Sequence, residues 1–201
     1  MSVNKSKLPF QNLYNCPKSE EMKITKLPIE GPLIIEPKIF KDPRGYFFES
    51  YNEKSFIEAG IDARFVQDNQ SLSQKGAVRG LHFQAPPFAQ GKLVRVTQGK
   101  VMDVVVDIRK GSPTYGQSAC VEISAENQIM FWIPPGFAHG FETLEDNTIF
   151  LYKCTNLYDK ASEGGLFWND PALGIQWQTQ HPIVSEKDQV LPLLSDLKSP
   201  F

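Results

Sequence analysis

The sequence predicts an all-β fold, a jelly-roll barrel or sandwich with a few short helices. Three observations support this prediction. The 201 residues include 15 prolines and 14 glycines, 11% of the residues are aromatic, and β-branched runs of strand length recur between the turns. Many short strands with glycine and proline turns and almost no helix are typical of an antiparallel sandwich or barrel.

The strands are recognised by β-branched and aromatic residues between turn signals. They are expected at residues 33–39, 46–50, 65–73, 77–84, 92–98, 101–108, 118–123, 129–133, 139–143 and 148–155. Turns such as Asp42-Pro43-Arg44-Gly45 separate them, and Gly99, Gly111 and Gly136 punctuate the later ones. The segment after Lys160 has weaker periodicity, and we expect it to wrap around the barrel.

One short helix is expected between the second and third strands. Asn52 can cap its start, and Gly60 can end it. Phe56 and Ile57 supply an apolar side that can pack against the sheet.

The chain is long enough for one domain with a core that needs no disulfide. With 41% hydrophobic and 22% charged residues, its composition is that of an ordinary soluble globular protein. Residues 1–21 alternate lysines, prolines and polar residues without the hydrophobic region of a signal peptide. We interpret them as an N-terminal extension and residues 22–201 as a single jelly-roll domain. No apolar run approaches membrane-spanning length, so no membrane partner is expected.

The net charge and the cysteines indicate which ligands and which cellular setting to expect. The net charge of −2 and the pI of about 5.9 provide no basic field of the kind that binds nucleic acid. An anionic ligand would have to be met by a local cluster of cations. Cys16, Cys120 and Cys154 lie far apart without zinc-ligand spacing, which favours a reduced, cytoplasmic setting.

The run Arg79-Gly80-Leu81-His82-Phe83-Gln84 places ionisable groups in a predicted strand. Because strand side chains alternate, Leu81 and Phe83 point to one side, and His82 and Gln84 point to the other. The polar face therefore carries an imidazole. A hydrogen-bonded histidine in the core or at its rim is the alternative interpretation.

Three further polar residues have apolar or aromatic neighbours within the strands, namely Lys92, His139 and Tyr152. Together with His82 they are expected to project into a largely apolar cavity, and the mouth of a barrel is a natural ligand site. The alternatives are a solvated edge lysine, a structural histidine near a turn and a core tyrosine. No His-x-His pair occurs, so we expect neither a metal site nor another cofactor.

Short motifs follow one another in a fixed order over residues 22–194. They are Asp42-Pro43-Arg44-Gly45, Phe47-Phe48-Glu49, Gln67-Asp68-Asn69, Arg79-Gly80-Leu81-His82-Phe83-Gln84, Gly111-Ser112-Pro113-Thr114, Pro134-Pro135-Gly136-Phe137-Ala138-His139-Gly140-Phe141, Tyr152-Lys153-Cys154 and Ser185-Glu186-Lys187-Asp188. In order and spacing this series resembles the dTDP-4-dehydrorhamnose 3,5-epimerase family. The resemblance implies a metal-free, cupin-type jelly roll that forms a homodimer and acts on dTDP-4-dehydro-6-deoxy-glucose in the pathway to dTDP-rhamnose.

The chemistry implied by this resemblance needs three groups. Inversion of a carbon beside a ketone requires a base for the α-proton, a group that stabilises the enolate oxygen, and an acid on the opposite face. The resemblance assigns His82 as the base, with Asp188 fixing its tautomer. It assigns Lys92 to the enolate oxygen and Tyr152 as the proton donor.

The resemblance also implies substrate contacts, some of them made across the dimer. The residues concerned are Arg44, Glu49, Gln67, Asp68, Asn69, Arg79, Lys92, His139, Glu163 and Lys187. Arg44 and Arg79 can form charge-assisted bidentate bonds to a diphosphate. Without the resemblance, Glu163 and Lys187 would be interpreted as solvated loop charges.

Three other functions remain to be compared. A single-centre epimerase acting at C3 or C5 would use nearly the same residues, although Tyr152 favours double epimerisation. A 3,4-ketoisomerase is disfavoured, because its motif around the catalytic histidine differs. A non-catalytic barrel that binds sugar nucleotides is disfavoured too, since a binding protein does not need a base, an orienting carboxylate, a cation and an acid together.

Overall fold

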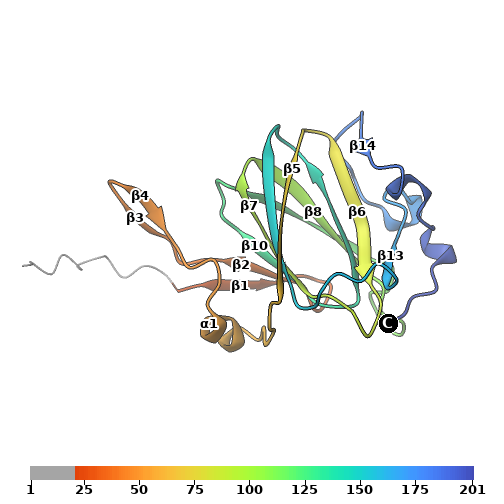
Figure 1. The fold of residues 1–201 in the computed structure, drawn as a ribbon, viewed down its shortest axis with the longest axis horizontal. Coiled ribbons are helices and arrows are strands. Elements are labelled where there is room, and N and C mark those ends of the chain that lie inside the picture. Colours follow the sequence, from red (N-terminus) through yellow and green to blue (C-terminus); the bar gives the residue numbers. More distant parts are fainter. Residues whose placement is uncertain (1–20) are drawn as a thin grey trace, which may run out of the picture.

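Two antiparallel β-sheets face each other in the computed structural model, which describes residues 21–201. The first sheet contains, in spatial order, β1 (Lys23–Lys26), β2 (Leu33–Glu36), β10 (Met130–Ile133), β7 (Lys92–Gln98), β12 (Thr148–Cys154) and β5 (Gln67–Ser73). The second contains β13 (Glu163–Gly165), β6 (Ala77–Gln84), β11 (Phe137–Thr143), β8 (Lys100–Asp107) and β9 (Ser118–Ser124), with β14 (Ile183–Val184) paired in parallel to β6. This arrangement (Figure 1) confirms the all-β prediction and is a cupin-like fold. The expected N-terminal extension lies, apart from residue 21, outside the described residues.

Strand β8 shows how alternation builds the two sides of the second sheet. Val101 and Val105 point between the sheets, where they join a core that includes Phe131 and Phe150 from the first sheet. Val104, with its even-numbered neighbours, packs on the outer face. Burying each such side chain contributes about 1.5–3 kcal/mol, so this alternation holds the sheets together.

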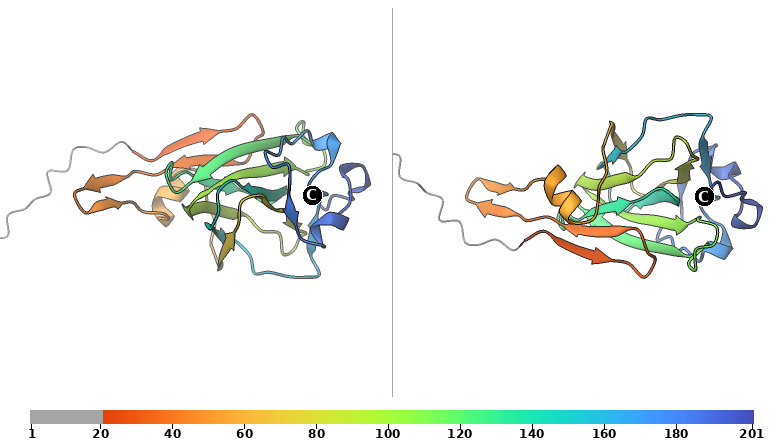
Figure 2. Two further views of the ribbon diagram at one scale, coloured as in Figure 1. Left: turned by 90° about the horizontal axis from the view of Figure 1, so that it is seen from above. Right: turned by 90° about the horizontal axis from the view of Figure 1, so that it is seen from below.

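The segment after Lys160 covers the outer face of the second sheet. Leu166 and Leu173 are buried there, and Trp177 and Phe201 pack against the same cluster. Besides β13 and β14 the segment forms three short 3-10 helices, η1 (Pro171–Leu173), η2 (Asp188–Val190) and η3 (Leu194–Asp196). The expectation that this segment wraps around the barrel is therefore confirmed, and Figures 1 and 2 show it along one side of the sandwich.

The predicted short helix is α1 (Glu53–Glu58), which covers the outer face of the first sheet. The side chain of Asn52 accepts a hydrogen bond from the backbone N–H of Ser55, as a cap does. Phe56 is buried, whereas Ile57 is 48% exposed, because a helix of this length presents only one side to the sheet. The prediction that Ile57 packs against the sheet was therefore wrong.

The predicted strand at 46–50 is instead half of a hairpin. β3 (Phe40–Asp42) pairs with β4 (Gly45–Phe47), and Figures 1 and 2 show this hairpin extending away from the two sheets. The preceding strand ends at Glu36, directly before Pro37, which has no backbone N–H to continue a ladder. Tyr46 and Phe47 are 58% and 65% exposed. The hairpin therefore carries exposed aromatic surface.

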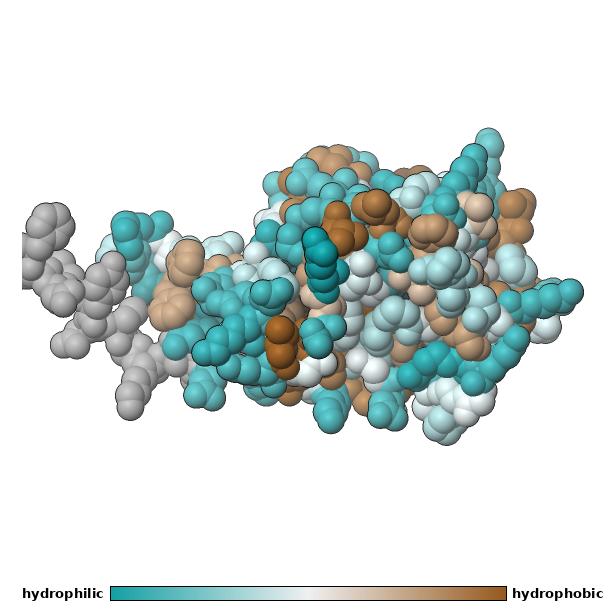
Figure 3. All heavy atoms as spheres, turned by 60° about the horizontal axis from the view of Figure 1, so that its bottom comes forward, coloured by the Kyte–Doolittle hydropathy of each residue, from teal (hydrophilic) through white to brown (hydrophobic). Residues whose placement is uncertain are grey.

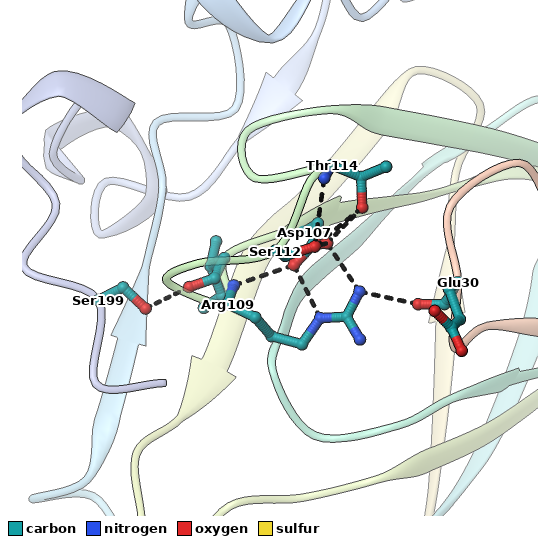
Figure 4. Close-up of polar contacts among 7 residues, drawn as sticks. Glu30, Asp107, Arg109, Ser112, Thr114 and Ser199 are labelled. Carbon is teal, nitrogen blue, oxygen red and sulfur yellow. Dashed lines mark hydrogen bonds and ion pairs between the residues drawn. The ribbon is translucent and has the colours of Figure 1, made fainter.

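A buried carboxylate fixes the loop after β8 (Figure 4). Asp107 accepts hydrogen bonds from the backbone and guanidinium N–H groups of Arg109 and from the hydroxyls of Ser112 and Thr114, at 2.6–2.9 Å. Burial acts to raise the pKa of Asp107, but these hydrogen bonds outweigh it and lower the pKa to about 2. Arg109 also donates to the carbonyl oxygen of Glu30 at 2.8 Å. This hydrogen bond links the loop after β8 to the segment between β1 and β2.

The surface is mixed in character. On the face drawn in Figure 3, hydrophobic residues are interspersed with hydrophilic ones over the sandwich. Within residues 21–201, no helix has the length and apolar character needed to cross a membrane.

Candidate active site

A cavity of about 560 Å³ opens between the two sheets. Its size is within the range of small-molecule sites. One wall carries His82 from β6 and His139 from β11, and the opposite sheet contributes Lys92 and Tyr152. The segment around β14 and η2 closes one side with Asp188 and its neighbours. The four strand residues that the sequence predicts to project into a cavity do line one together.

His82 and Asp188 form a hydrogen-bonded pair in this cavity. His82 Nε2 lies 2.7 Å from Asp188 Oδ1, and Asp188 Oδ2 accepts a hydrogen bond from the backbone N–H of Gly80 at 3.2 Å. Burial acts to raise the pKa of Asp188, but the hydrogen bond and charge of His82 outweigh it and lower the pKa. An ionised carboxylate holds the proton of a neutral imidazole on Nε2, which leaves Nδ1 able to accept one.

The position of His82 follows from strand alternation. Its neighbours Leu81 and Phe83 pack into the outer apolar cluster, so His82 faces the opposite way. Gln84 is buried and donates hydrogen bonds to the carbonyl oxygens of Phe88 and Leu157, so its role is structural.

Lys92 and Tyr152 stand on the wall opposite His82. No hydrogen bond or ion pair to the Lys92 ammonium or to the Tyr152 hydroxyl occurs among residues 21–201, so both groups are available to a ligand. Burial lowers the pKa of Lys92, and the charges of Cys154, Asp103 and Glu163 oppose that effect. Burial also raises the pKa of Tyr152, so the phenol keeps its proton at neutral pH.

A second histidine–carboxylate pair lies beside the first. His139 Nε2 is 3.0 Å from both carboxylate oxygens of Asp103, and both residues are buried. His139 is also the register partner of His82 across β11 and β6. Sequence reasoning named His139 but missed Asp103. The available signal was a carboxylate in the middle of the valine-rich run that forms β8.

Charged residues continue around the cavity. Arg79 lines it and donates from Nε to Ser73 Oγ at 3.1 Å. Lys187 also lines the cavity and forms an ion pair with Glu163, which accepts a further hydrogen bond from the Tyr158 hydroxyl. Burial acts to raise the pKa of Glu163, but its bond to Lys187 outweighs this and lowers the pKa. Together with Lys92, Arg79 and Lys187 bring three cationic side chains to the cavity.

The remaining predicted contacts do not line this cavity. On β5, Gln67 donates to the side-chain oxygen of Asn69 at 3.1 Å. Asp68 points to the outer face, where it pairs with Lys153 at 2.8 Å.

Arg44 and Glu49 belong to the hairpin region, away from this cavity. The guanidinium of Arg44 pairs with Asp42, and its side chain is 90% exposed. Glu49 accepts a hydrogen bond from Asn52 at 3.1 Å and lines a separate hollow beside α1.

No group of three or more histidine, cysteine or carboxylate side chains is arranged to hold a metal ion within residues 21–201.

Comparison with known proteins assigns a family to this architecture. Residues 26–196 match the family described as dTDP-4-dehydrorhamnose 3,5-epimerase. A protein of that name from Salmonella typhimurium is 55% identical over 175 residues, which cover 86% of this chain and 96% of the relative.

Comparison with solved structures gives the same family. The dTDP-4-dehydrorhamnose 3,5-epimerase of Elizabethkingia anophelis superposes with a TM-score of 0.85 at 48% identity, covering 90% of this chain and 100% of that chain. The dTDP-6-deoxy-D-glucose-3,5-epimerase of Legionella pneumophila, whose structure is a complex with dTDP-4-keto-L-rhamnose, gives a TM-score of 0.84 at 49% identity over 88% and 94% of the two chains.

The fold, the cavity and these similarities define a cupin-like isomerase. Within that class, the chain belongs to the dTDP-4-dehydrorhamnose 3,5-epimerase family. It is therefore an epimerase of dTDP-rhamnose biosynthesis.

Proposed function

We propose that the chain inverts both C3 and C5 of dTDP-4-dehydro-6-deoxy-D-glucose, giving dTDP-4-dehydro-L-rhamnose. One observation carries this proposal. His82, which is paired with Asp188, faces Lys92 and Tyr152 across one cavity. A base on one sheet and an acid on the other can act on opposite faces of a sugar ring bound between them.

In each inversion, His82 Nδ1 takes the proton from the carbon beside the C4 ketone. The electron pair of the broken C–H bond forms the enolate, and its negative charge settles on the C4 oxygen. Asp188 stabilises the imidazolium that results. The Lys92 ammonium stabilises the enolate oxygen, with more effect in a partly desolvated cavity than in water.

Tyr152 then protonates the same carbon from the opposite face. Although burial raises the pKa of this phenol, an enolate carbon is a much stronger base than a phenolate, so the transfer runs downhill. Exchange with solvent returns the proton from His82 to Tyr152. Because C3 and C5 both flank the C4 ketone, one lysine can serve both inversions. The steps move protons only, so they require no redox cofactor and no metal.

The same cavity supplies candidate contacts for the nucleotide portion. Arg79 and Lys187 offer charge to the diphosphate, the guanidinium in bidentate fashion. His139, which lines the cavity, and Glu163, which pairs with the lining residue Lys187, are the proposed contacts of the sugar or its linkage, and Gln67 and Asn69 on β5 are further proposed contacts. Asp68 remains a prediction of the sequence, since it faces away from the cavity.

Arg44 and Glu49 would contact substrate across a homodimer. The hairpin that carries Arg44 extends from its own sandwich, and its exposed aromatic residues Tyr46 and Phe47 offer surface for a second copy. In this arrangement the hairpin of one protomer completes the cavity of its partner.

Proton NMR of dTDP-4-dehydro-6-deoxy-glucose in D2O tests the proposal. We expect deuterium to enter at C3 and C5 with the wild-type enzyme and at neither carbon with His82→Asn. His181→Asn is the matched control, because His181 is the exposed histidine outside the cavity. Deuterium at one carbon alone would indicate a single-centre epimerase. None at either carbon would refute the proposed reaction and favour a different nucleotide sugar or a binding function.

A further inference from the structure

A carboxylate occupies an inward-facing core position in the sheet that forms one wall of the cavity. Asp103 lies on β8 between Val101 and Val105, the two valines that point into the core between the sheets. Its exposed fraction is 0%. Placing a carboxylate at such a position costs free energy unless partners compensate. We therefore expect neighbouring groups to compensate the cost of burying Asp103.

Within residues 21–201, the side chain of Asp103 has hydrogen bonds to His139 alone. Both oxygens of Asp103 lie 3.0 Å from His139 Nε2. An ionised carboxylate only accepts, so Nε2 carries the proton, and Nδ1 is left as the acceptor of the ring. Burial lowers the pKa of His139, which favours the neutral imidazole even beside a carboxylate. Burial raises the pKa of Asp103, and the charge and hydrogen bond of His139 and the charge of Lys92 oppose that effect. With Asp103 ionised and His139 neutral, the pair carries one negative charge.

That charge acts on Lys92 across the cavity. Of the three groups that oppose the desolvation of Lys92, Cys154 has a pKa raised by burial and so stays a neutral thiol. Glu163 is already paired with Lys187. Asp103 is therefore the remaining carboxylate that can stabilise the Lys92 ammonium, because its own partner, His139, is neutral.

The titratable and charged groups that surround this region come from every element packed against it. They are His82 and Arg79 on β6, Lys92 on β7, Asp103 on β8, Cys120 on β9, His139 on β11, Tyr152 and Cys154 on β12, Glu163 on β13, and Lys187 and Asp188 beyond β14.

We propose that Asp103 is a positioning residue of the epimerase cavity: it fixes the proton of the neutral His139 ring on Nε2, and it keeps the Lys92 ammonium protonated. His139 then accepts a hydrogen bond from a sugar hydroxyl through Nδ1 and does not donate one. Lys92 keeps the charge that stabilises the enolate oxygen. The part concerning catalysis rests on the proposed function, whereas the protonation states do not.

Substrate-free NMR tests the protonation states directly. In the wild-type enzyme at pH 7.5, the ¹⁵N shifts of His139, assigned with His139→Gln, should report a neutral ring protonated on Nε2. The ¹³Cε resonance of Lys92, assigned with Lys92→Arg, should titrate in Asp103→Asn about one pH unit or more below wild type, the size of shift that one neighbouring charge produces. An Nδ1-protonated or doubly protonated His139, or an unchanged Lys92 titration, would overturn the proposal.

Kinetics test the catalytic consequence. The alkaline limb of the pH profile of kcat should move to lower pH in Asp103→Asn by the same amount, with a smaller change in KM. Asp107→Asn is the matched control, because it removes a buried carboxylate from the same strand outside the cavity. It should lower stability and leave both the Lys92 titration and the pH profile unchanged. A kcat profile of Asp103→Asn that coincides with wild type would show that Asp103 serves the fold alone.

The two proposals fail in different ways. If the wild-type enzyme exchanges no deuterium at C3 or C5, the proposed reaction is refuted, while the NMR result still decides the protonation states. If Asp103→Asn fails to fold, the wild-type spectrum of His139 alone can contradict the proposal.

Discussion

Replacing Asp188 by asparagine should disable the base while leaving the cavity in shape. Asp188 Oδ2 accepts from the backbone N–H of Gly80, and its other oxygen is bonded to His82 Nε2. The Gly80 N–H can only donate, so the amide oxygen of the asparagine must take that position. Its NH2 group then faces His82 and donates to Nε2, which moves the ring proton to Nδ1. The nitrogen that should remove the α-proton is thereby blocked.

The size of this effect follows from the two interactions that are lost. Restoring the productive tautomer would set two donors against each other in a buried site, at a cost of about 1–3 kcal/mol. The imidazolium would also lose a charge-assisted hydrogen bond, at about 1.5–3 kcal/mol. Together these raise the barrier by about 3–6 kcal/mol, which corresponds to a loss of about 10²- to 10⁴-fold in kcat.

Initial rates of deuterium entry, measured over a range of substrate concentrations, separate kcat from KM. We expect KM to change little, because the asparagine side chain has nearly the same shape as that of aspartate. Asp188→Ala is the informative comparison, since it frees His82 to adopt either tautomer and should therefore be more active than Asp188→Asn. If Asp188→Asn kept more than a tenth of wild-type kcat, or if the alanine variant were the less active one, the tautomer argument would be refuted.

Three further outcomes are expected. Asp107→Asn should lower the free energy of unfolding at pH 7. Since folding depresses the pKa of Asp107 from 3.8 to about 2, about 2 kcal/mol of that loss should disappear as the pH of urea titrations falls from about 4 to 2, and a gap independent of pH would contradict this. Gly140→Ala should lower Tm markedly, because a Cβ there would lie 2.5 Å from the carbonyl oxygen of Arg79; an unchanged melting curve would show that the two strands can separate at little cost. Tyr152→Phe should slow formation of the inverted product at least 10-fold, the lower part of the range for one acid or base, while proton removal by His82 continues, and equal rates of exchange and inversion would argue against Tyr152 as the acid.

Local patterns in the sequence were enough to predict several elements. Alternation between Leu81, His82 and Phe83 set the inward direction of the imidazole, and Asn52 marked the start of the helix. Local patterning did not predict the length of the strand before Pro37 or the exposed position of Ile57. The first depends on a missing backbone donor, and the second depends on which side of a short helix meets the sheet.

Contacts between distant residues could not be derived in this way. Asp103 reads as an isolated acid in a strand, and it has a partner only because β11 lies beside β8 and brings His139 to it. The pairing of His82 with Asp188 spans 106 residues, and the resemblance to a family predicted it where periodicity could not.

The sequence by itself determined most of the strands, the short helix and the direction of His82, because these depend on interactions between residues a few positions apart. Tertiary structure alone decided that Lys92 and Tyr152 face His82 across one cavity and that Asp68 points away from it. It also decided that Asp103 is buried among valines with a histidine as its partner. These features depend on the order and register of the strands. That order is set by the burial of two apolar sheet faces against each other, to which every strand contributes and which no single segment encodes.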